Sequence, residues 1–586
     1  MRQWMVAAKK ADFYAIAEKF HVDPVVARII RNREVIGEKN IRIYLGGNLS
    51  DLSDPHQMKD MDRLVEILAK KIRKQVRIRI IGDYDVDGVT SSHLFLTALR
   101  RVGAKVDVVI PHRIQDGYGL SLHLLQQAKE DGVDTILTCD NGIAAIDEIA
   151  WAKAQKMTVL VTDHHAVPFE EHEGRRTEKK SLADAVVNPH QQDCGYPYKE
   201  LCGAGVAWNV IRVLYENYDM DKREAEDLLD FVAMATVCDV MSLTGENRIL
   251  VKEGLKRIRH TKNIGLQALM QACNVQPENI SAYHFGYVLG PCVNATGRLD
   301  TARHALRLFE TGQETEAEEI ARDLVDLNQE RKELTLQGVE MAKKLCEEGG
   351  YEMDPVLVLF LPDVHESIAG LIAGRIREMY NRPVFVLTRG EEGVKGSGRS
   401  TENYSMYENM CGCAELFTKF GGHPMAAGLS LPEENVEKFR RKINENCPLT
   451  VEEVCPDIHI DMAMPVGYAS TELVHQFALL EPFGKDNPSP LFADRNLSIS
   501  RMWVIGKNRN VLRMSVLSEY GQPVPVIFFG DVETLFAYFT EKFGQEEVEN
   551  ALHGRKNRIL FSMVYTAKID FYQGNENLQL EMKYYR

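Results

Sequence analysis

The chain has 586 residues, of which 45% are hydrophobic and 26% are charged. This is the composition of a folded protein, and about two to four domains are expected at this length. No segment approaches the roughly 20 consecutive apolar residues that span a bilayer, which argues against an integral membrane protein.

Cysteine usage and the first residues of the chain favour the cytoplasm. The eleven cysteines are scattered, and the only close pair is Cys411 and Cys413, so neither a CxxC zinc pattern nor a disulfide framework is present. The first twenty residues lack an apolar stretch followed by a small-residue cleavage site, so they do not indicate a secretory signal. We therefore expect a cytoplasmic protein with reduced thiols.

The formal net charge of −15 argues at first against a nucleic-acid partner, because phosphate binding depends on Lys and Arg. The charge of individual segments differs from this total. Basic side chains outnumber acidic ones in residues 1–45, and further basic groups lie within 501–513 and 555–558. Each of these patches is equally compatible with an ordinary solvated surface of mixed charge.

Strand and helix patterns alternate from residue 76 to residue 165. This alternation is typical of a doubly wound parallel sheet with right-handed crossovers, so the predicted fold class is α/β. Strands are predicted at 76–85, 105–113, 134–142 and 158–165, and helices at 89–103, 121–132 and 144–157.

The remaining sequence predicts several further regions. A second, smaller α/β pattern follows a long charged helical stretch, and short β-like runs separated by turns then favour a small β-barrel of the oligonucleotide-binding (OB) kind. The expected division is a basic N-terminal segment at 1–45, an α/β domain at 46–300, a helical connector at 301–350, the second α/β domain at 351–455 and an OB-like nucleic-acid-binding domain at 456–586.

Carboxylates and histidines fall at the ends of three predicted strands. In an open parallel sheet, ligand sites form outside the carboxyl ends of the strands, so residues spread over eighty positions can converge on one pocket. Several carboxylates at close quarters repel one another unless a positive charge compensates them, and bound divalent cations would supply it. The residues are Asp83, Asp85 and Asp87, then Asp140, then Asp163, His164 and His165.

The residue types indicate which cations these would be. Carboxylate oxygens suit Mg²⁺ or Mn²⁺, and an imidazole in the set favours Mn²⁺. Two such ions about 3.5–4 Å apart can activate a water and bind the oxygens of a phosphodiester. The sequence therefore predicts two divalent cations, Mn²⁺ or Mg²⁺, and metal-assisted hydrolysis.

Other interpretations exist for each fragment alone. The Asp-x-Asp-x-Asp-Gly spacing from Asp83 matches the start of an EF-hand loop, but the twelfth position is Leu94 rather than Glu and the preceding residues are strand-like. A single Asp after a strand, such as Asp140, is usually a helix cap or turn residue. A histidine pair is often buried and hydrogen-bonded within a core.

Taken together, these segments resemble the DHH phosphoesterases. The matching motifs are GDYDVDGVTSS, TCDNG, TDHH and LLDFVAMATVCDVMSLTGENRIL. The resemblance implies that Asp85, Asp87, Asp140, His164 and Asp239 are metal ligands, with Asp83 also close to the cations. It further implies catalytic roles for Asp87, Asp140 and His165, of which His165 would hold the substrate phosphate or donate a proton.

Further motifs are similar to those of the RecJ exonucleases, and the likeness covers roughly residues 30–586. They include PHRIQDGYGLS, NPHQ, LCGAGVAW, LGPCVNATGRL, KGSGRS, FGGHPMAAG and EPFGKDNPSPLF. The resemblance implies hydrolysis of single-stranded DNA from the 5′ end to mononucleotides, in DNA repair and recombination. Single-strand-binding protein and a RecQ-type helicase are the partners that it implies.

The same resemblance indicates residues that grip the DNA. Arginine offers a fork matched to phosphate oxygens, and glycines let backbone amides approach the strand closely. The expected substrate-binding residues are Arg113, Asn294, Arg298, Ser397, Arg399, Ser400, Gly421, Gly422 and His423. Three positions depart from the usual pattern: Val364 and Glu366 stand where an aromatic residue and a glycine are frequent, and Cys292 replaces a common Arg.

Two other functions are open to a chain of this superfamily. One is a DHH phosphoesterase that acts on short oligonucleotides or cyclic dinucleotides, which the acidic net charge favours and the C-terminal domain disfavours. The other is a non-catalytic replication scaffold, which the complete set of ligand positions disfavours.

Overall fold

A computed structural model describes residues 3–112, 116, 119–172, 175–299, 302–351, 353–390, 393–506, 510–572 and 574–586. The chain forms two compact units. Unit 1 contains residues 52–241 and 249–456, and unit 2 contains residues 3–51, 242–248 and 457–586. Among the described residues, no helix combines the length and apolar character needed to cross a membrane.

The first part of unit 1 is built on a five-stranded parallel sheet in the order β3-β2-β4-β5-β8. The α/β prediction is therefore confirmed. The strands are β2 (Arg77–Ile81), β3 (Lys105–Val109), β4 (Thr135–Cys139), β5 (Thr158–Thr162) and β8 (Ala185–Val187).

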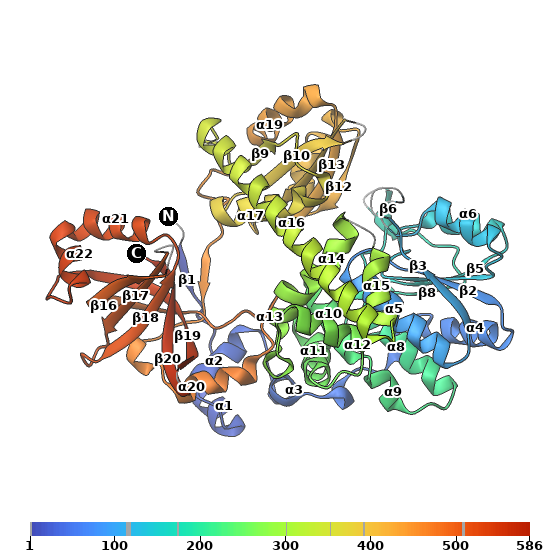
Figure 1. Cartoon of the computed structure of the whole chain (residues 1–586), viewed down its shortest axis with the longest axis horizontal. Helices are drawn as coiled ribbons and strands as arrows, with labels where there is room; N and C mark the ends of the chain where they lie inside the picture. Colours follow the sequence, from blue (N-terminus) through green and yellow to red (C-terminus); the bar gives the residue numbers. More distant parts are fainter. Residues whose placement is uncertain are drawn as a thin grey trace. The chain divides into compact units, whose positions relative to one another are not determined.

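Helices cover both faces of this sheet (Figure 1). On one face lie α4 (Met61–Arg73), α5 (Val86–Arg101) and α8 (Gly203–Asn217). On the other, α6 (Leu122–Glu130) and α7 (Ile146–Ala154) bury Leu125 and Ile149 against Ile136 and Val159 of the sheet. Because both faces are covered, the central strands are almost wholly buried: every residue of β4 is buried, and in β2 and β5 only the first residue is not.

A helical region follows the sheet. Its elements are α10 (Leu229–Cys238), α11 (Gly245–Ile258), α12 (Ile264–Ala272), a turn of π-helix at Phe285–Leu289, α14 (Gly290–Leu299), α15 (Ala302–Glu310) and α16 (Glu314–Glu348). The predicted connector is thus two helices. The chain breaks at Thr311–Gln313, where the exposed Gly312 interrupts the helical pattern.

The second α/β part of unit 1 has five strands in the order β12-β13-β11-β10-β9. They are β9 (Leu357–Phe360), β10 (Val384–Gly390), β11 (Gly393–Arg399), β12 (Lys419–His423) and β13 (Ala426–Leu431). Helix α17 (Glu366–Tyr380) packs against α16. The two helices approach closely at Gly338, where a Cβ atom would lie 2.3 Å from Ile372 Cδ1.

Unit 2 contains a closed sheet, because β16 (Phe492–Ile505) pairs with both β17 (Val511–Leu517) and β19 (Leu560–Tyr572). The remaining strands are β15 (Met462–Ala463), β18 (Pro523–Phe529) and β20 (Asn575–Tyr585), with α21 (Val532–Phe543) and α22 (Gln545–Leu552) between β18 and β19. Most strand pairs of this sheet are antiparallel, but β18 pairs with β20 in parallel. Closure of the sheet confirms the expected barrel.

Residues from the beginning of the chain complete the core of unit 2. β1 (Trp4–Val6) pairs in parallel with β14 (Ile458–Ile460), and α1 (Phe13–Phe20), α2 (Pro24–Asn32) and α3 (Glu38–Gly46) follow it. Val26 and Ile30 of α2 are buried in the same apolar cluster as the barrel residues.

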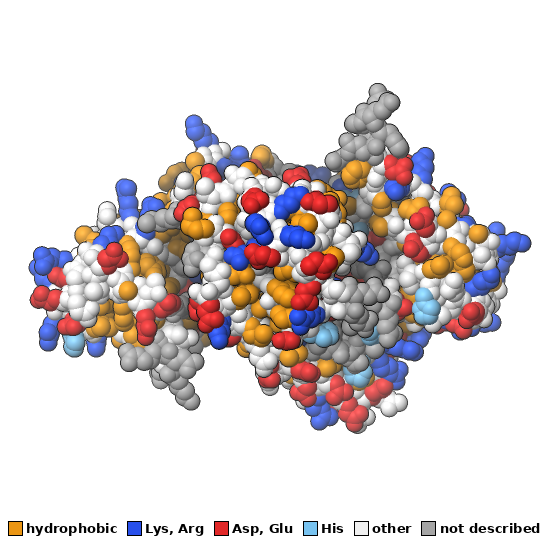
Figure 2. All heavy atoms as spheres, turned by 90° about the horizontal axis from the view of Figure 1, so that it is seen from above, with side chains coloured by type: hydrophobic (Ala, Val, Ile, Leu, Met, Phe, Trp, Pro, Cys, Tyr) orange, Lys and Arg blue, Asp and Glu red, His pale blue; other side chains and the backbone are white. Residues whose placement is uncertain are grey.

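Charged side chains of both signs are interspersed on the face of the molecule that Figure 2 shows. On that face the excess of acidic residues does not form one continuous patch, so the net charge of −15 does not describe each local surface.

Candidate metal centre

The candidate site lies at the carboxyl ends of three adjacent parallel strands. Asp83 and Asp85 stand between β2 and α5, and Asp87 is in the first turn of α5. Asp140 follows β4 in a left-handed backbone conformation with a φ of 61°, and His164 and His165 follow β5. Asp239 adds a carboxylate from outside the sheet, because it caps the C-terminus of α10.

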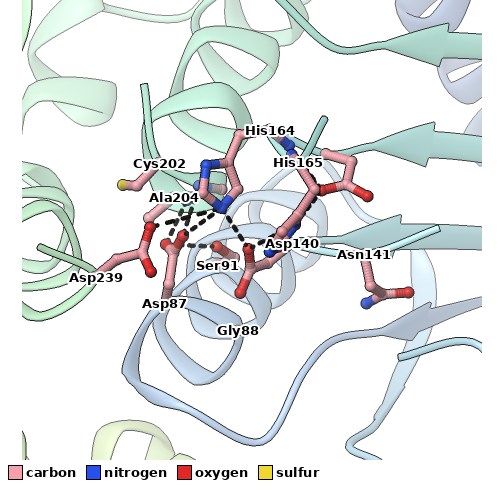
Figure 3. Close-up of polar contacts among 12 residues, drawn as sticks. Asp87, Gly88, Ser91, Asp140, Asn141, His164, His165, Cys202, Ala204 and Asp239 are labelled. Carbon is pink, nitrogen blue, oxygen red and sulfur yellow. Dashed lines mark hydrogen bonds and ion pairs between the residues drawn. The ribbon is translucent and has the colours of Figure 1, made fainter. Parts of the chain in front are cut away.

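The side chains of Asp87, Asp140 and Asp239 converge on His164 (Figure 3). The His164 Nε2 atom is 3.1 Å from an Asp140 oxygen, 3.6 Å from an Asp239 oxygen and 3.7 Å from an Asp87 oxygen. Three groups have ligand atoms within 4.8 Å of one another: Asp140, His164 and His165; Asp87, His164 and Asp239; and Asp83, Asp85 and Asp140. The groups share members, so the residues form one continuous cluster.

Backbone amides hold Asp87 in place. The amides of Gly203 and Ala204 donate to its two carboxylate oxygens over 2.6 and 2.7 Å. Both belong to the first turn of α8, where unpaired amides and the helix dipole favour an anion. The sequence analysis did not predict this role of the LCGAGVAW motif. Gly203 could have indicated it, because a Cβ atom at this position would lie 2.6 Å from Asp140 Cβ, so only glycine lets the α8 amides come this close to the site.

Burial and mutual repulsion make the cluster electrostatically unfavourable without added positive charge. Burial, followed by the charge of Asp85, raises the pKa of Asp83 well above its usual range. Burial and the charge of Asp87 do the same to the pKa of Asp140. Removing carboxylates from water while they repel one another disfavours ionisation, and divalent cations reverse this effect.

The buried Asp83 Oδ1 atom has no hydrogen-bond partner within the described residues, and His164 Nε2 faces three carboxylate oxygens without forming a regular hydrogen bond to any of them. Burial lowers the pKa of His164, which keeps its ring neutral, the form that ligates metals. Carboxylate oxygens together with a neutral imidazole fit Mn²⁺ or Mg²⁺ as ligands. Buried ligand atoms without a protein partner are expected at such a site, because the metal ion is their partner.

Asp163 orients His165, although the sequence prediction gave Asp163 no separate role. An Asp163 oxygen lies 2.8 Å from His165 Nδ1 and also accepts from the backbone amides of His164 and His165. Burial disfavours the charged imidazole, but the hydrogen bond and charge of Asp163 outweigh it and raise the pKa of His165 to about 9. In the absence of metal the two neighbouring rings thus differ, because Asp163 favours the imidazolium form of His165 whereas burial favours the neutral form of His164.

The substrate-binding candidates on α14 contact the surrounding protein. The Asn294 side-chain oxygen accepts from the Val86 amide at 3.2 Å, which fixes the loop that carries Asp83 and Asp85. Arg298 donates to the Ser367 carbonyl oxygen at 2.5 Å. Arg113 lies outside the described residues.

The remaining candidates lie in the second α/β part. A groove of about 440 Å³ is lined by residues that include Ser397, Gly421, Lys395 and Glu366. Arg399 Nη1 donates to the Gly398 carbonyl oxygen at 2.7 Å. Ser400 is fully buried and donates to the Tyr404 carbonyl oxygen, so it does not face the groove. Gly422 and His423 lie on β12 opposite Ala427 and Ala426.

The departures from the family pattern have identifiable surroundings. Glu366 begins α17 and forms an ion pair of 2.7 Å with Lys395 in the groove. Val364 is buried in the core formed with α16 and α17. The Cys292 thiol is buried, 3.8 Å from Cys273 Sγ, and accepts from Asn328.

Three family models match the chain. They are the DHH family N-terminal domain at residues 77–236, the DHHA1 domain at 353–447 and the RecJ OB domain at 460–584. Among curated proteins, the single-stranded-DNA-specific exonuclease RecJ of Haemophilus influenzae is 32% identical over 96% of both chains. The chain belongs to the RecJ family. The resemblance inferred from the motifs is thereby confirmed.

Other RecJ proteins support the same assignment. The exonuclease RecJ of Escherichia coli is 32% identical over 95% of both chains. RecJ of Bacillus subtilis is also 32% identical, but this chain spans only 63% of its length. The crystal structure of Thermus thermophilus RecJ in complex with Mn²⁺ matches the whole chain and 79% of its own, with a TM-score of 0.81 at 25% identity.

Proposed function

We propose that this RecJ-family chain is a metal-dependent exonuclease that hydrolyses single-stranded DNA in the 5′→3′ direction and releases 5′-mononucleotides. The observation that carries the proposal is the cluster of carboxylates around His164, within a chain whose relatives are single-stranded-DNA-specific exonucleases. By family membership, its roles would lie in DNA repair and recombination in the cytoplasm.

The proposed ligands of two divalent cations are Asp83, Asp85, Asp87, Asp140, His164 and Asp239. When bound there, Mn²⁺ or Mg²⁺ supplies the positive charge that lets the carboxylates ionise and makes a water more acidic. Asp87 and Asp140 reach toward His164 from α5 and β4, and the α8 amides keep Asp87 aimed at the site. Because the ligand side chains are already held in place, the site needs little rearrangement of its charges during the reaction.

His165 acts on the substrate in this proposal. Its imidazolium would hold a phosphate oxygen and can give a proton to the leaving oxygen. Asp163 fixes the ring and stabilises its charge. Because Asp163 acts through His165, it is a positioning residue.

The DNA strand would continue from the metal centre along the groove that contains Ser397 and Gly421. Arg113, Arg298 and Arg399 are the proposed phosphate contacts, and Gly422 and His423 extend the same strand of the sheet as Gly421. Asn294 and Ser400 support this surface through the backbone contacts that they make. Single-strand-binding protein and a RecQ-type helicase remain proposed protein partners.

The test is hydrolysis of end-labelled DNA by the purified protein with Mn²⁺. Single strands labelled at the 5′ end should release the label early as mononucleotide, while strands labelled at the 3′ end release it late. Asp87→Asn should abolish hydrolysis, whereas Asp147→Asn, an exposed carboxylate on α7, should not. Equal rates on duplex and single-stranded DNA would contradict the proposed specificity.

A further inference from the structure

Unit 1 contains a cavity of about 960 Å³ that is separate from the metal centre. It lies at the C-terminal end of α5, where Arg100 lines it, whereas Asp87 stands in the first turn of the same helix. These positions are roughly 20 Å apart along the helix axis. The helices that surround the cavity, α5, α10, α11, α12 and α15, are grouped in Figure 1.

Three aromatic side chains that are almost fully buried, His93, Phe231 and Phe309, close the inner end of this cavity, so a ligand reaches only their edges. The His93 and Phe231 rings lie 4.4 Å apart between centroids, and Phe309 lies 5.0 Å from Phe231. His93 is only 5% exposed, and its Nδ1 atom has no hydrogen-bond partner within the described chain. Burial, reinforced by Arg100, lowers its pKa to about 3, so the ring is neutral at physiological pH.

Two further buried polar atoms beside these rings also lack partners within the described residues. They are Arg257 Nε, a donor, and Glu310 Oε1, an acceptor. Arg257 and Glu310 both line the cavity. An unpaired buried polar group is unfavourable, so such groups are normally satisfied by a ligand or water. The donor and the acceptor can pair with the polar edge of a nucleobase, and the neighbouring aromatic rings can contact its face.

The outer part of the cavity carries cations. The side chains of Arg100, Lys256 and Lys262 are 56%, 63% and 92% exposed. Each is in an ion pair. The pair of Lys262 with Asp227 is exposed on both sides and is worth little, so it can be exchanged for a phosphate, whereas the partners of Arg100 and Lys256, Glu310 and Glu253, are only 16% and 15% exposed. The N-terminus of α12 follows Lys262 directly, and helix N-termini favour phosphate groups.

We propose that this cavity is a binding site for a nucleoside monophosphate. The base lies against His93, Phe231 and Phe309 and hydrogen-bonds to the unpaired atoms, and the phosphate reaches Lys256 and Lys262. The volume is within the range of about 300–1,000 Å³ that small-molecule sites have. The inference does not depend on the proposed nuclease function, because none of its residues belongs to the metal centre.

The test is calorimetric titration of the metal-free full chain in EDTA, so that a nucleotide held at the metal centre does not contribute. The probes are dAMP, AMP, deoxyadenosine and inorganic phosphate. We expect saturable binding of dAMP or AMP at one site, with the nucleoside and phosphate at least about tenfold weaker because each makes only part of the contacts. The dAMP and AMP titrations distinguish a deoxynucleotide from a ribonucleotide source.

A matched pair of variants locates the binding. Gly312 lines the cavity, and a Cβ atom there meets no atom within 4 Å, so Gly312→Trp adds a large side chain at the edge of the cavity without a backbone clash. Gly46 in unit 2 is equally open, and Gly46→Trp is the control. Gly312→Trp should lose nucleotide binding with an unchanged melting temperature, while Gly46→Trp should keep it.

A second variant removes only the exposed cations. Lys256→Ala/Lys262→Ala should weaken nucleotide binding about tenfold and leave nucleoside binding unchanged. The proposal is overturned if neither nucleotide binds the metal-free protein, if Gly312→Trp binds as tightly as the wild type, or if phosphate alone binds as tightly as the nucleotides.

Discussion

Asp140 illustrates how a single residue can favour function while disfavouring folding. It is 2% exposed and its neighbours are carboxylates, so burial and the charge of Asp87 raise its pKa well above the usual range. Its removal should relieve repulsion in the metal-free protein. The same change should weaken the site that those carboxylates form for cations.

We predict that Asp140→Asn raises the stability of the metal-free protein, because it removes one of several buried carboxylates that repel one another. Hydrolysis should be lost, and Mn²⁺ should no longer raise the melting temperature as it does in the wild type. Thermal unfolding in EDTA and in Mn²⁺ measures both effects. The exposed Asp147→Asn is the control, and a metal-free Asp140→Asn protein less stable than the wild type would contradict the repulsion argument.

The Asp163–His165 pair predicts a pH dependence. The pKa of His165 is raised to about 9, so the imidazolium is present below that pH and is lost as pH rises through it. In Asp163→Asn the hydrogen bond to a carboxylate is gone and burial then lowers the pKa. The alkaline decline in kcat/KM should therefore move to lower pH, with a reduction in rate of about 10²-fold or more at neutral pH.

The measurement is the pH profile of single-strand hydrolysis with Mg²⁺. Asp134→Asn, before β4 and thus at the other end of the strand, should leave the profile unchanged. An Asp163→Asn profile that is lowered uniformly at all pH values would indicate a purely structural role for this carboxylate.

At the scale of elements, the sequence predicted the parallel sheet well and its loops less well. The strand patterns at 76–85, 134–142 and 158–165 correspond to β2, β4 and β5, which are shorter because their last residues leave the sheet to form the site. Apolar β-branched runs specify buried strands locally. The amides that hold Asp87 belong to α8, more than a hundred residues away, and no local pattern encodes that contact.

The groove beside α17 permits a prediction about DNA affinity. Glu366 places a negative charge at the start of this helix and pairs with Lys395 of β11. Glu366→Gln should free Lys395 for a phosphate, so affinity for single-stranded DNA should rise about 2- to 5-fold. The salt dependence should steepen by about 0.7 for each additional phosphate that the protein neutralises. Binding titrations with Ca²⁺ at several salt concentrations measure both.

Glu378→Gln supplies the matched control for this change, because Glu378 is 60% exposed near the other end of α17 and does not line the groove. Its affinity and salt dependence should equal those of the wild type. Unchanged binding in Glu366→Gln would mean that Lys395 does not contact the strand.

At the scale of the whole molecule, unit 2 combines segments that are distant in the sequence. The sequence predicted a separate basic segment at 1–45, but Val26 and Ile30 in that segment lie in the core of unit 2 with barrel residues such as Met502. The buried Arg33–Asp461 ion pair of 2.8 Å joins the same two segments. Counting charges along the chain could not reveal this shared core. The apolar face of α2 indicates that the helix is buried, but it does not indicate which part of the chain the helix packs against.

The discontinuous core predicts that α2 stabilises the barrel. Ile30 is 1% exposed, and Ile30→Ala should lower the free energy of unfolding of unit 2 by about 2–4 kcal/mol through lost burial and a cavity. Ile36, which is 56% exposed shortly after α2, offers the control, since Ile36→Ala should change stability by less than about 0.5 kcal/mol. Hydrogen exchange measured by mass spectrometry should show faster exchange in β16, β17 and β19 of the Ile30→Ala protein, with β2, β4 and β5 unchanged. If β16, β17 and β19 keep their protection, the barrel folds independently of the first fifty residues, and the shared core contributes little to its stability.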